Sequence, residues 1–328
     1  MKAIVQDVYG PPDVLRLEEV EKPEVGDDDV LVRVHAAGVD PGVWHLMMGL
    51  PYLVRVMGLG LRRPKVRVRG LDLAGRVEAV GGNVTRFRAG DEVYGACDTA
   101  RGGSFAEYAC APEERLALKP ANLTFEQAAA VPVSGCTALQ GLREAGELQP
   151  GQGVLVIGAG GGVGTFAVQL AKAFGAEVTG ACSTAKVDLV RSLGADDVVD
   201  SAHDRYLDGT RRYDLILDTA GRRPLSHLRR ALAPKGTLVI VGGEGGDRWL
   251  GGFDRQILRA PLLSLFVGQT LRPLMAKERQ EDLLTLKELI EAGKVTPVID
   301  RTYPLSEAAE AIRYLHEGRA RGKVVVAV

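Results

Sequence analysis

The chain has 328 residues, of which 46% are apolar and 25% charged, and its net charge is −1 with histidine neutral. This length predicts about two domains, and the composition excludes a disordered chain. The balanced charge gives no reason to expect nucleic acid as a partner. Glycine stands out with 41 residues, but no Gly-X-Y period indicates collagen.

Residues 1–125 contain short β-like runs that are separated by turn residues. Three of these runs cover residues 2–6, 29–35 and 75–80, with Gly-Asp and Gly-Gly pairs between them. Short strands at this spacing are typical of a compact, mostly antiparallel, barrel-like domain.

From residue 126 onward, apolar strand-like runs alternate with helix-like stretches. The predicted strands are 153–158, 176–181, 196–200, 213–218 and 236–243, and the predicted helices between them are 163–175, 184–194 and 224–233. Strands buried on both faces and separated by helices predict a doubly wound parallel sheet of the Rossmann type.

Near residue 265 this alternation stops, and a predicted helix at 282–293 and a last strand at 322–328 follow. We interpret this tail as a return to the first domain. The predicted domains are therefore 1–125 plus 266–328, which is discontinuous, and 126–265, which binds the nucleotide. The apolar run 261–267 is predicted to be a strand that closes the parallel sheet and pairs with a second copy in a homodimer.

The cysteines and the N-terminus bear on where the protein resides. Four cysteines, at positions 97, 110, 136 and 182, are far apart and form no C-x-x-C pair, which is typical of a reducing compartment. Residues 1–12 contain no apolar segment of a signal peptide, and no apolar run reaches the ~18 residues of a membrane span. We therefore predict a cytoplasmic protein without integral membrane association.

The strongest chemical signal is the segment VLVIGAGGGVG at 154–164. It contains A-x-G-x-x-G from Ala159 to Gly164, directly after a predicted strand and directly before a predicted helix. In this context Gly161 would let the backbone approach a pyrophosphate, and Gly164 would let the helix pack closely on the strand. The helix N-terminus would then bind the phosphates. The segment therefore predicts a dinucleotide site, and a plain packing turn is the alternative.

The end of the second strand of this domain predicts which dinucleotide binds. NAD sites place a carboxylate there to accept from the ribose 2′-hydroxyl, but this chain has Ser183, Thr184 and Lys186. Two hydroxyls and an ammonium favour the 2′-phosphate of NADPH. Alternatively, Ser183 or Thr184 caps the following helix, and both interpretations can hold together.

Residues 55–69 contain six basic side chains and no acidic one. We interpret this stretch as a solvated face. Attraction of an anionic substrate or of a membrane surface is the alternative.

Motifs along nearly the whole chain resemble the medium-chain dehydrogenase/reductase superfamily, and within it the zinc-independent quinone oxidoreductase-like and enoyl reductase-like branch. The resemblance implies a GroES-like first domain and a Rossmann domain. The motifs that carry it are GLDLAGRVEAVG (70–81), GDEVYG (90–95), GGSFAEYA (102–109), AAAVPVSGCTALQGL (128–142), GAGGGVGTFAVQLAKAFGA (158–176), LGADDVVD (193–200), LDTAG (217–221) and GKVVV (322–326).

Zinc-dependent members of this superfamily have a cysteine in an early turn and a later Gly-His-Glu sequence. This chain has Asp40 in that turn and Gly70-Leu71-Asp72 at the later position, and the four-cysteine structural lobe is absent from the sequence. Its five histidines form no cluster in the sequence that provides the three or four ligands zinc needs. We therefore predict no bound metal.

The resemblance also implies cofactor contacts. Thr137 and Lys323 would lie near the site, and Phe266 and Val267 would cover the nicotinamide ring. The remaining implied contacts are Gly161, Gly162, Val163 and Gly164 at the pyrophosphate, Ser183, Thr184 and Lys186 at the 2′-phosphate, and Thr219, Ala220, Gly242 and Gly243 at the ribose and nicotinamide. Residues 242–246 are equally well interpreted as a flexible glycine loop. Ser201 stands where many relatives place a tyrosine, which weakens the NADPH prediction slightly.

Without zinc, hydride transfer favours an acceptor that spreads charge by conjugation. We therefore predict an NADPH-dependent reductase of a small quinone or α,β-unsaturated carbonyl compound, with an NADPH-binding structural or regulatory protein as the alternative. Asp40 and Tyr52 are the candidate proton donors, and Tyr52 is also interpretable as a packing residue. Trp44 and Met48, with Tyr52 and Phe266, are the predicted walls of the substrate pocket.

Overall fold

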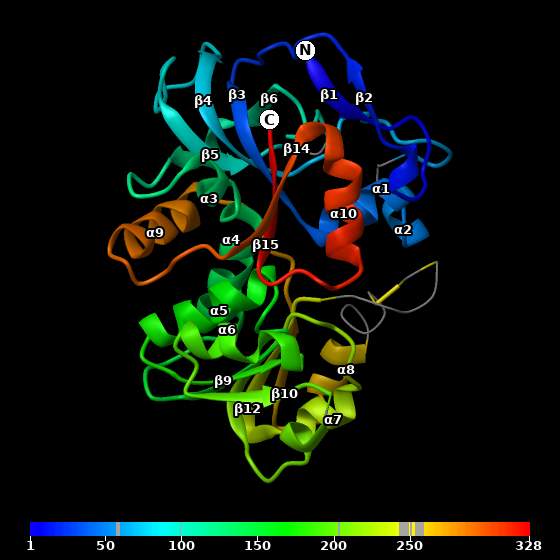
Figure 1. Cartoon of the computed structure of the whole chain (residues 1–328). Coiled ribbons are helices and arrows are strands. Elements are labelled where there is room, and N and C mark those ends of the chain that lie inside the picture. The colour runs from blue at the N-terminus through cyan, green and yellow to red at the C-terminus, as the bar shows by residue number, and fades with distance from the viewer. Residues whose placement is uncertain (57–59, 99, 203, 243–248, 250, 253–258) are drawn as a thin grey trace. The chain divides into compact units, whose positions relative to one another are not determined.

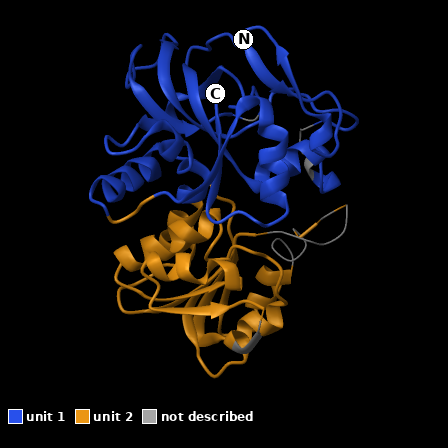
Figure 2. Ribbon diagram, viewed as in Figure 1, with its two compact units in different colours: residues 1–136, 278–293, 297–328 blue, residues 137–277, 294–296 orange. Residues whose placement is uncertain are grey.

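The computed structural model describes the chain except for residues 57–59, 99, 203, 243–248, 250 and 253–258, and divides it into two compact units (Figure 2). Unit 1 comprises Met1–Cys136, Glu278–Gly293 and Pro297–Val328, and unit 2 comprises Thr137–Lys277 and Lys294–Thr296. Residues 126–136 thus belong to unit 1 and residues 266–277 to unit 2, beyond the borders predicted at 125 and 265. The physical reason is that the last strand of the parallel sheet lies after residue 265.

Unit 1 is built around a mainly antiparallel sheet of seven strands among the described residues (Figure 1). Its order is β14-β15-β3-β4-β5-β7, with β6 paired to β3, and only β14 and β15 run parallel. The strands are β3 (Asp29–Val39), β4 (Asp72–Val80), β5 (Glu92–Ala96), β6 (Tyr108–Pro112), β7 (Leu116–Leu118), β14 (Ile299–Pro304) and β15 (Lys323–Ala327); β1 (Lys2–Val5) and β2 (Arg16–Glu19) form a separate pair. This confirms the predicted antiparallel, GroES-like architecture.

Helices of unit 1 pack against this sheet, α3 and α10 among them. Helix α10 buries Ala308, Ala311 and Ile312, whose three- and four-residue spacing places them on one side, against Met47 and Val324. The helices are α1 (Pro41–Met48), α2 (Tyr52–Val54), α3 (Phe125–Ala129), α9 (Gln280–Glu291) and α10 (Ala308–His316), and α4 (Pro132–Gln140) crosses the border between the units; the 3-10 turns are η1 (Pro12–Val14), η3 (Glu113–Arg115) and η8 (Leu305–Glu307).

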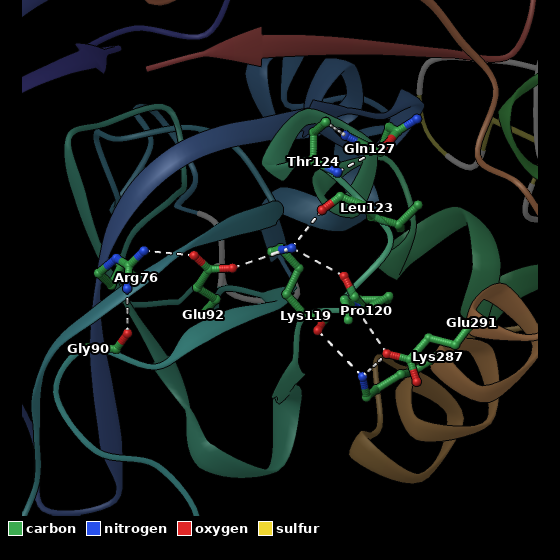
Figure 3. Close-up of polar contacts among 11 residues, drawn as sticks. Arg76, Gly90, Glu92, Lys119, Pro120, Leu123, Thr124, Gln127, Lys287 and Glu291 are labelled. Carbon is green, nitrogen blue, oxygen red and sulfur yellow. Dashed lines mark hydrogen bonds and ion pairs between the residues drawn. The ribbon is translucent and has the colours of Figure 1, made fainter.

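A polar network fixes the chain between β7 and α3 (Figure 3). The ammonium of Lys119 donates to the carbonyl of Leu123 at 2.6 Å and lies 3.4 Å from the carboxylate of Glu92. Helix α3 then begins after Thr124, whose hydroxyl accepts from the Gln127 N–H while the Gln127 side chain accepts from the Thr124 N–H. This reciprocal capping satisfies two helix-end donors and fixes where α3 begins.

Unit 2 contains a parallel sheet of six strands among its described residues, in the order β10-β9-β8-β11-β12-β13. This is the 3-2-1-4-5-6 order of the Rossmann fold, and it confirms the predicted doubly wound domain. The strands are β8 (Gly153–Ile157), β9 (Glu177–Cys182), β10 (Asp197–Asp200), β11 (Tyr213–Asp218), β12 (Leu232–Ile240) and β13 (Thr270–Pro273). The helices are α5 (Gly162–Ala173), α6 (Val187–Ser192), α7 (Leu225–Arg230) and α8 (Ala260–Ser264), with the π-helix η4 (Gly141–Ala145) and the 3-10 turns η5 (Thr184–Lys186) and η6 (Asp204–Leu207).

The predicted strand at 261–267 is wrong, because this segment is helix α8 followed by a turn. Pro261 occupies the first turn of the helix, where its missing N–H costs nothing, whereas it could not donate to a sheet ladder. The strand that closes the sheet is β13, which pairs with β12. In the part of the chain that is described, no helix is long and apolar enough to cross a membrane.

Candidate active site

The glycine-rich loop lies where the order of the parallel sheet reverses, at the carboxyl end of β8. Gly158 ends the strand with a φ of 83°, a left-handed conformation that glycine adopts without strain. Helix α5 begins at Gly162 with Gly161 as its N-cap, and no side chain caps this end. In an open parallel sheet the crevice beside such a switch point binds the ligand, and the helix end favours anions.

Two glycines of this loop are required for different reasons. A Cβ at Gly164 would lie 2.1 Å from the carbonyl oxygen of Gly158 and 2.7 Å from Cα of Ala159, so helix and strand approach too closely for a side chain. A Cβ at Gly161 would meet its nearest neighbour, again the carbonyl oxygen of Gly158, at 3.3 Å. The fold itself therefore needs glycine strictly at 164, whereas at 161 a Cβ would fill space that a phosphate can occupy.

The second strand of the sheet, β9, ends beside this loop. Gly160 lies directly against the stem of Lys186, because a Cβ there would be 2.8 Å from it. Ser183 is the N-cap of η5 but makes no capping hydrogen bond with its side chain, so that alternative for Ser183 is wrong. Thr184 donates its hydroxyl to Asp200 at the end of β10. Exposed Ser183 and half-buried Lys186 are thus the polar groups that fit a 2′-phosphate.

Sequence reasoning missed two charged residues at this edge, Asp200 and Arg223. Asp200 engages the hydroxyl of Thr184, and Arg223 donates to the backbone oxygen of Ser201. Burial, with a contribution from the negative charge of Asp200, raises the pKa of the Cys182 thiol. The signal that would have found Asp200 is its position at the end of the strand adjacent to β9.

The end of β11 adjoins the same loop. Thr219 donates its hydroxyl to the Ile157 oxygen at 2.8 Å, and this hydroxyl lies 2.4 Å from where a Cβ on Gly158 would be. A Cβ on Gly242, after β12, would lie 2.5 Å from the Thr219 oxygen. The structure thus brings Thr219 and Gly242 together, with Ala220 next in the chain, at the carboxyl ends of β8, β11 and β12.

Two predicted cofactor residues, Phe266 and Val267, lie apart from this group. Phe266 is 79% exposed in the turn after α8, and Val267 lines a surface hollow with Pro234 at the amino end of β12. The glycine loop is at the opposite, carboxyl end of the parallel sheet, so neither residue reaches it. This prediction failed because it treated 261–267 as a strand. Gly243 lies outside the described residues, and Thr137 is a buried residue of α4.

In unit 1, three buried charged side chains form one cluster. The Lys323 ammonium donates to Oδ1 of Asp40 at 2.6 Å and to Oδ2 of Asp72 at 3.0 Å. Their side-chain exposures are 2%, 3% and 0% in that order. Lys323 begins β15, Asp40 is the N-cap of α1, and Asp72 begins β4. Lys323 therefore binds carboxyl groups within unit 1, a role that its predicted cofactor contact did not include.

The residues at the positions where zinc-dependent members hold the metal do not fit zinc. Asp40 and Asp72 already bind an ammonium, and Leu71, which stands where zinc-dependent members have histidine, offers no ligand atom. Among the residues that the structure describes, no group of three or more His, Cys, Asp or Glu side chains is placed to hold a metal.

The predicted pocket residues follow Asp40 along α1. Trp44 and Met48 come four and eight positions after Asp40, so all three share one side of the helix. The Trp44 ring stacks on His316 of α10 with centroids 3.4 Å apart. Tyr52 is half-buried, and the Arg55 guanidinium lies 4.9 Å from its ring centroid. Tyr52 therefore packs at the C-terminal end of α1.

The basic side chains of 55–69 are mostly solvated, with two exceptions, the half-buried Arg55 and the buried Arg69. Arg67, for example, is exposed and pairs with Asp7 at 2.7 Å. Arg69 is only 4% exposed, and its Nε donates to Gln6 at 2.6 Å. Its Nη2 is buried without a hydrogen-bond partner among the described residues. Burial lowers the pKa of Arg69 to about 10.

A Rossmann unit with a glycine loop at its switch point, together with a GroES-like unit in one chain, is the architecture of dinucleotide-dependent dehydrogenases and reductases. Family models agree: one described as an alcohol dehydrogenase GroES-like domain matches residues 26–121, and one described as a zinc-binding dehydrogenase matches 193–326.

Similar proteins cover the whole chain. It is 35% identical to 2-methylene-furan-3-one reductase of Solanum lycopersicum and 35% identical to NADPH-dependent alkenal/one oxidoreductase, chloroplastic, of Arabidopsis thaliana. Each match covers 99% of this chain and 79% of the relative. The solved quinone oxidoreductase of Coxiella burnetii is 30% identical with a TM-score of 0.86, covering 100% of this chain and 99% of that one. The chain belongs to the medium-chain dehydrogenase/reductase superfamily.

Proposed function

We propose that the protein is an NADPH-dependent, zinc-independent oxidoreductase that transfers hydride to a conjugated acceptor, a quinone or an α,β-unsaturated carbonyl compound. The observation that carries this proposal is the glycine loop at the switch point of the parallel sheet, with no carboxylate in the chain directly after β9. The names of the relatives support the acceptor class, because alkenals, alkenones, methylene-furanones and quinones are all conjugated.

The choice of NADPH over NADH rests on Ser183 and Lys186. Lys186 lies against the glycine loop, and Ser183 has no capping bond to occupy its hydroxyl. Asp200 is near enough to bind Thr184, so Thr184 contributes less than its sequence position suggested. The double variant Ser183→Ala/Lys186→Ala should weaken NADPH binding while NADH binding changes little. An unchanged preference between the two, measured by fluorescence titration, refutes this assignment.

When bound, the nicotinamide supplies the hydride. The glycine loop and the N-terminus of α5 would hold the pyrophosphate, and Thr219, Ala220 and Gly242 would border the ribose and nicotinamide. Because the residues present do not fit zinc, the acceptor must spread the incoming charge through its own conjugation. Asp40 is the proposed proton donor, and Trp44 and Met48, on its side of α1, are the proposed pocket walls.

Turnover separates this function from the alternative, an NADPH-binding protein with little activity, which none of the named relatives supports. We expect NADPH oxidation, followed by absorbance, with a panel of enones, enals and quinones, and little with unconjugated ketones. Tight NADPH binding without turnover of any acceptor refutes the proposal.

Two further predictions concern location and assembly. The cytoplasmic location remains a prediction, and one relative carries the word chloroplastic in its name. A homodimer also remains a prediction, and the sheet edge now available to it is β13 rather than 261–267. Exposed Leu262, Leu265 and Phe266 flank that edge in sequence. A monomeric mass by light scattering refutes the dimer.

A further inference from the structure

A surface hollow of unit 2 lies at the amino ends of three strands of the parallel sheet, whereas the glycine loop is at the carboxyl end. Its volume is about 480 Å³, and ligand pockets have volumes of roughly 300–1,000 Å³. Arg212 directly precedes β11, Pro234 is in the first part of β12, and Gln269 directly precedes β13. Helix α7, which packs beside β12 (Figure 1), provides a further side of the hollow.

The lining of this hollow carries more positive than negative charge. Its described lining residues include Arg212, Arg229 and Arg230, after which we call it the arginine hollow, and one aspartate. That aspartate, Asp208, accepts from the N–H and the hydroxyl of Thr210 through Oδ1, at 2.8 and 2.6 Å. None of the three arginines forms an ion pair within the described part of the chain. Like charges repel one another, so an anion among these guanidinium groups is favourable.

Gln269 fixes two of the arginines beside each other. Its Oε1 accepts from Nε of Arg229 at 3.1 Å, and its Nε2 donates to the Arg229 carbonyl at 2.9 Å. The Leu232 carbonyl lies 3.5 Å from the same Nε2 and accepts from Nη1 of Arg212 at 3.4 Å. The other N–H groups of both guanidiniums make no hydrogen bond to a described residue, so they are available to a ligand.

Helix α7 adds a hydroxyl and the third guanidinium. Ser226, Arg229 and Arg230 are at positions i, i+3 and i+4, so they lie on one side of this helix. The Arg230 side chain makes neither a hydrogen bond nor an ion pair with any described residue. Attraction of cations to a helix C-terminus accounts for Arg229 and Arg230. It does not account for Arg212, which is outside the helix and lines the same hollow.

We propose that the arginine hollow binds a small ligand that carries phosphate groups. A guanidinium presents parallel N–H donors that match two oxygens of a phosphate, and the Ser226 hydroxyl adds a neutral donor. A phosphate group carries about −1.5 to −2 charges near pH 7, which offsets the excess positive charge of the lining. A soluble phosphate compound and the phosphorylated headgroup of a lipid share this chemistry. The site goes beyond the proposed function and does not depend on it.

Calorimetric titration with inorganic pyrophosphate tests the proposal. The protein is first saturated with NADPH, so that the glycine loop does not compete for the added phosphate, and the ionic strength is held constant. We expect pyrophosphate to bind at a single site. Arg212→Ala and Arg230→Ala should each raise its Kd about tenfold or more, because each removes charge-assisted hydrogen bonds. Both side chains are exposed, so both variants should fold.

A third variant and a matched control separate the hollow from general surface charge. Ser226→Asp places a carboxylate where it pairs with Arg229 and Arg230, so the Kd for pyrophosphate should rise as well. An aspartate in the first turn of α7 is favourable for the helix, so this variant should also fold. Arg191→Ala removes an arginine of α6 that is 63% exposed and is not among the lining residues. It should change the Kd by less than about twofold, because exposed charges at a distance are screened.

Vesicle sedimentation then distinguishes the two sources of phosphate. If pyrophosphate binds, retention by phosphatidylcholine vesicles that contain phosphatidylinositol bisphosphate, lost in Arg230→Ala, assigns a lipid headgroup. Pyrophosphate binding without such retention assigns a soluble ligand. Absence of pyrophosphate binding, or binding that Arg212→Ala, Arg230→Ala and Ser226→Asp leave unchanged, overturns the proposal and leaves the proposed reductase function intact. A protein that binds pyrophosphate in the hollow but reduces no acceptor refutes the proposed function alone.

Discussion

Two alanine substitutions in the glycine loop should have different effects, one on the stability of the fold and the other on cofactor binding. Gly164→Ala places a methyl group 2.1 Å from one backbone atom and 2.7 Å from another, and neither can move without separating α5 from β8. Overpacking of this kind costs about 1–3 kcal/mol and more where backbone must shift. We expect Gly164→Ala to lower the free energy of unfolding by about 3 kcal/mol.

Gly161→Ala should leave the fold nearly intact and damage cofactor binding instead. Its φ of −97° suits alanine, and the nearest described atom is 3.3 Å from the new methyl group. The loss of stability is about 0.5–1 kcal/mol, because alanine is a poorer N-cap than glycine. If the phosphate approaches the backbone here, the Kd for NADPH should rise about 10- to 100-fold, which is about 1.4–2.7 kcal/mol.

The assays are chemical denaturation without cofactor and calorimetric titration with NADPH. Gly153→Ala is the matched control, because it lies in β8 itself and its Cβ would meet its nearest neighbour at 3.8 Å. Wild-type affinity in Gly161→Ala refutes the approach of the phosphate to residue 161. Wild-type stability in Gly164→Ala refutes the close helix–strand packing that the fingerprint requires.

Two further predictions concern unit 1. Burial lowers the pKa of Arg69 to about 10, which corresponds to about 3 kcal/mol against the charged form. Arg69→Met should therefore raise the free energy of unfolding by about 1 kcal/mol at pH 7, after the lost bond to Gln6 is subtracted. Because the pKa of Arg69 is lowered in the folded state, the wild-type fold becomes more stable as pH rises through about 10. In denaturant titrations, the difference in free energy of unfolding between Arg69→Met and wild type should therefore shrink above that pH. An Arg69→Met variant that is less stable than wild type at pH 7 contradicts the reasoning. Tyr52→Phe should leave NADPH turnover on an enone unchanged, because Tyr52 packs against Arg55; a loss of about 100-fold or more in kcat would make Tyr52 the proton donor instead.

Features that depend on local sequence pattern were predictable. Alternating strands and helices between 153 and 243 predicted the parallel sheet, because strands such as β8 and β9 are buried along most of their length and carry the apolar pattern within themselves. The glycine fingerprint at 159–164 could also be recognised from the sequence, because strand, turn and helix follow one another directly. These predictions needed no information about which distant segments meet.

Features that depend on distant contacts were not predictable. Asp40 and Lys323 are 283 positions apart in the sequence, and Asp72 and Lys323 are 251 positions apart. Nothing in the sequence relates these three charges. They meet because β15, β3 and β4 are neighbours in the sheet of unit 1. The segment 261–267 failed for another reason. A short apolar run fits a strand or a helix equally well, and Pro261 was the overlooked signal for a helix start.

The most direct test of the proposed function follows the hydrogen itself. The protein is incubated with NADPH that carries deuterium at both C4 positions of the nicotinamide and with a conjugated enone, and the product is analysed by mass spectrometry and NMR. The proposed function predicts a saturated ketone with one deuterium at the β-carbon and a solvent-derived hydrogen at the α-carbon. A product with no deuterium at the β-carbon, or no reduction of any conjugated acceptor, would contradict it.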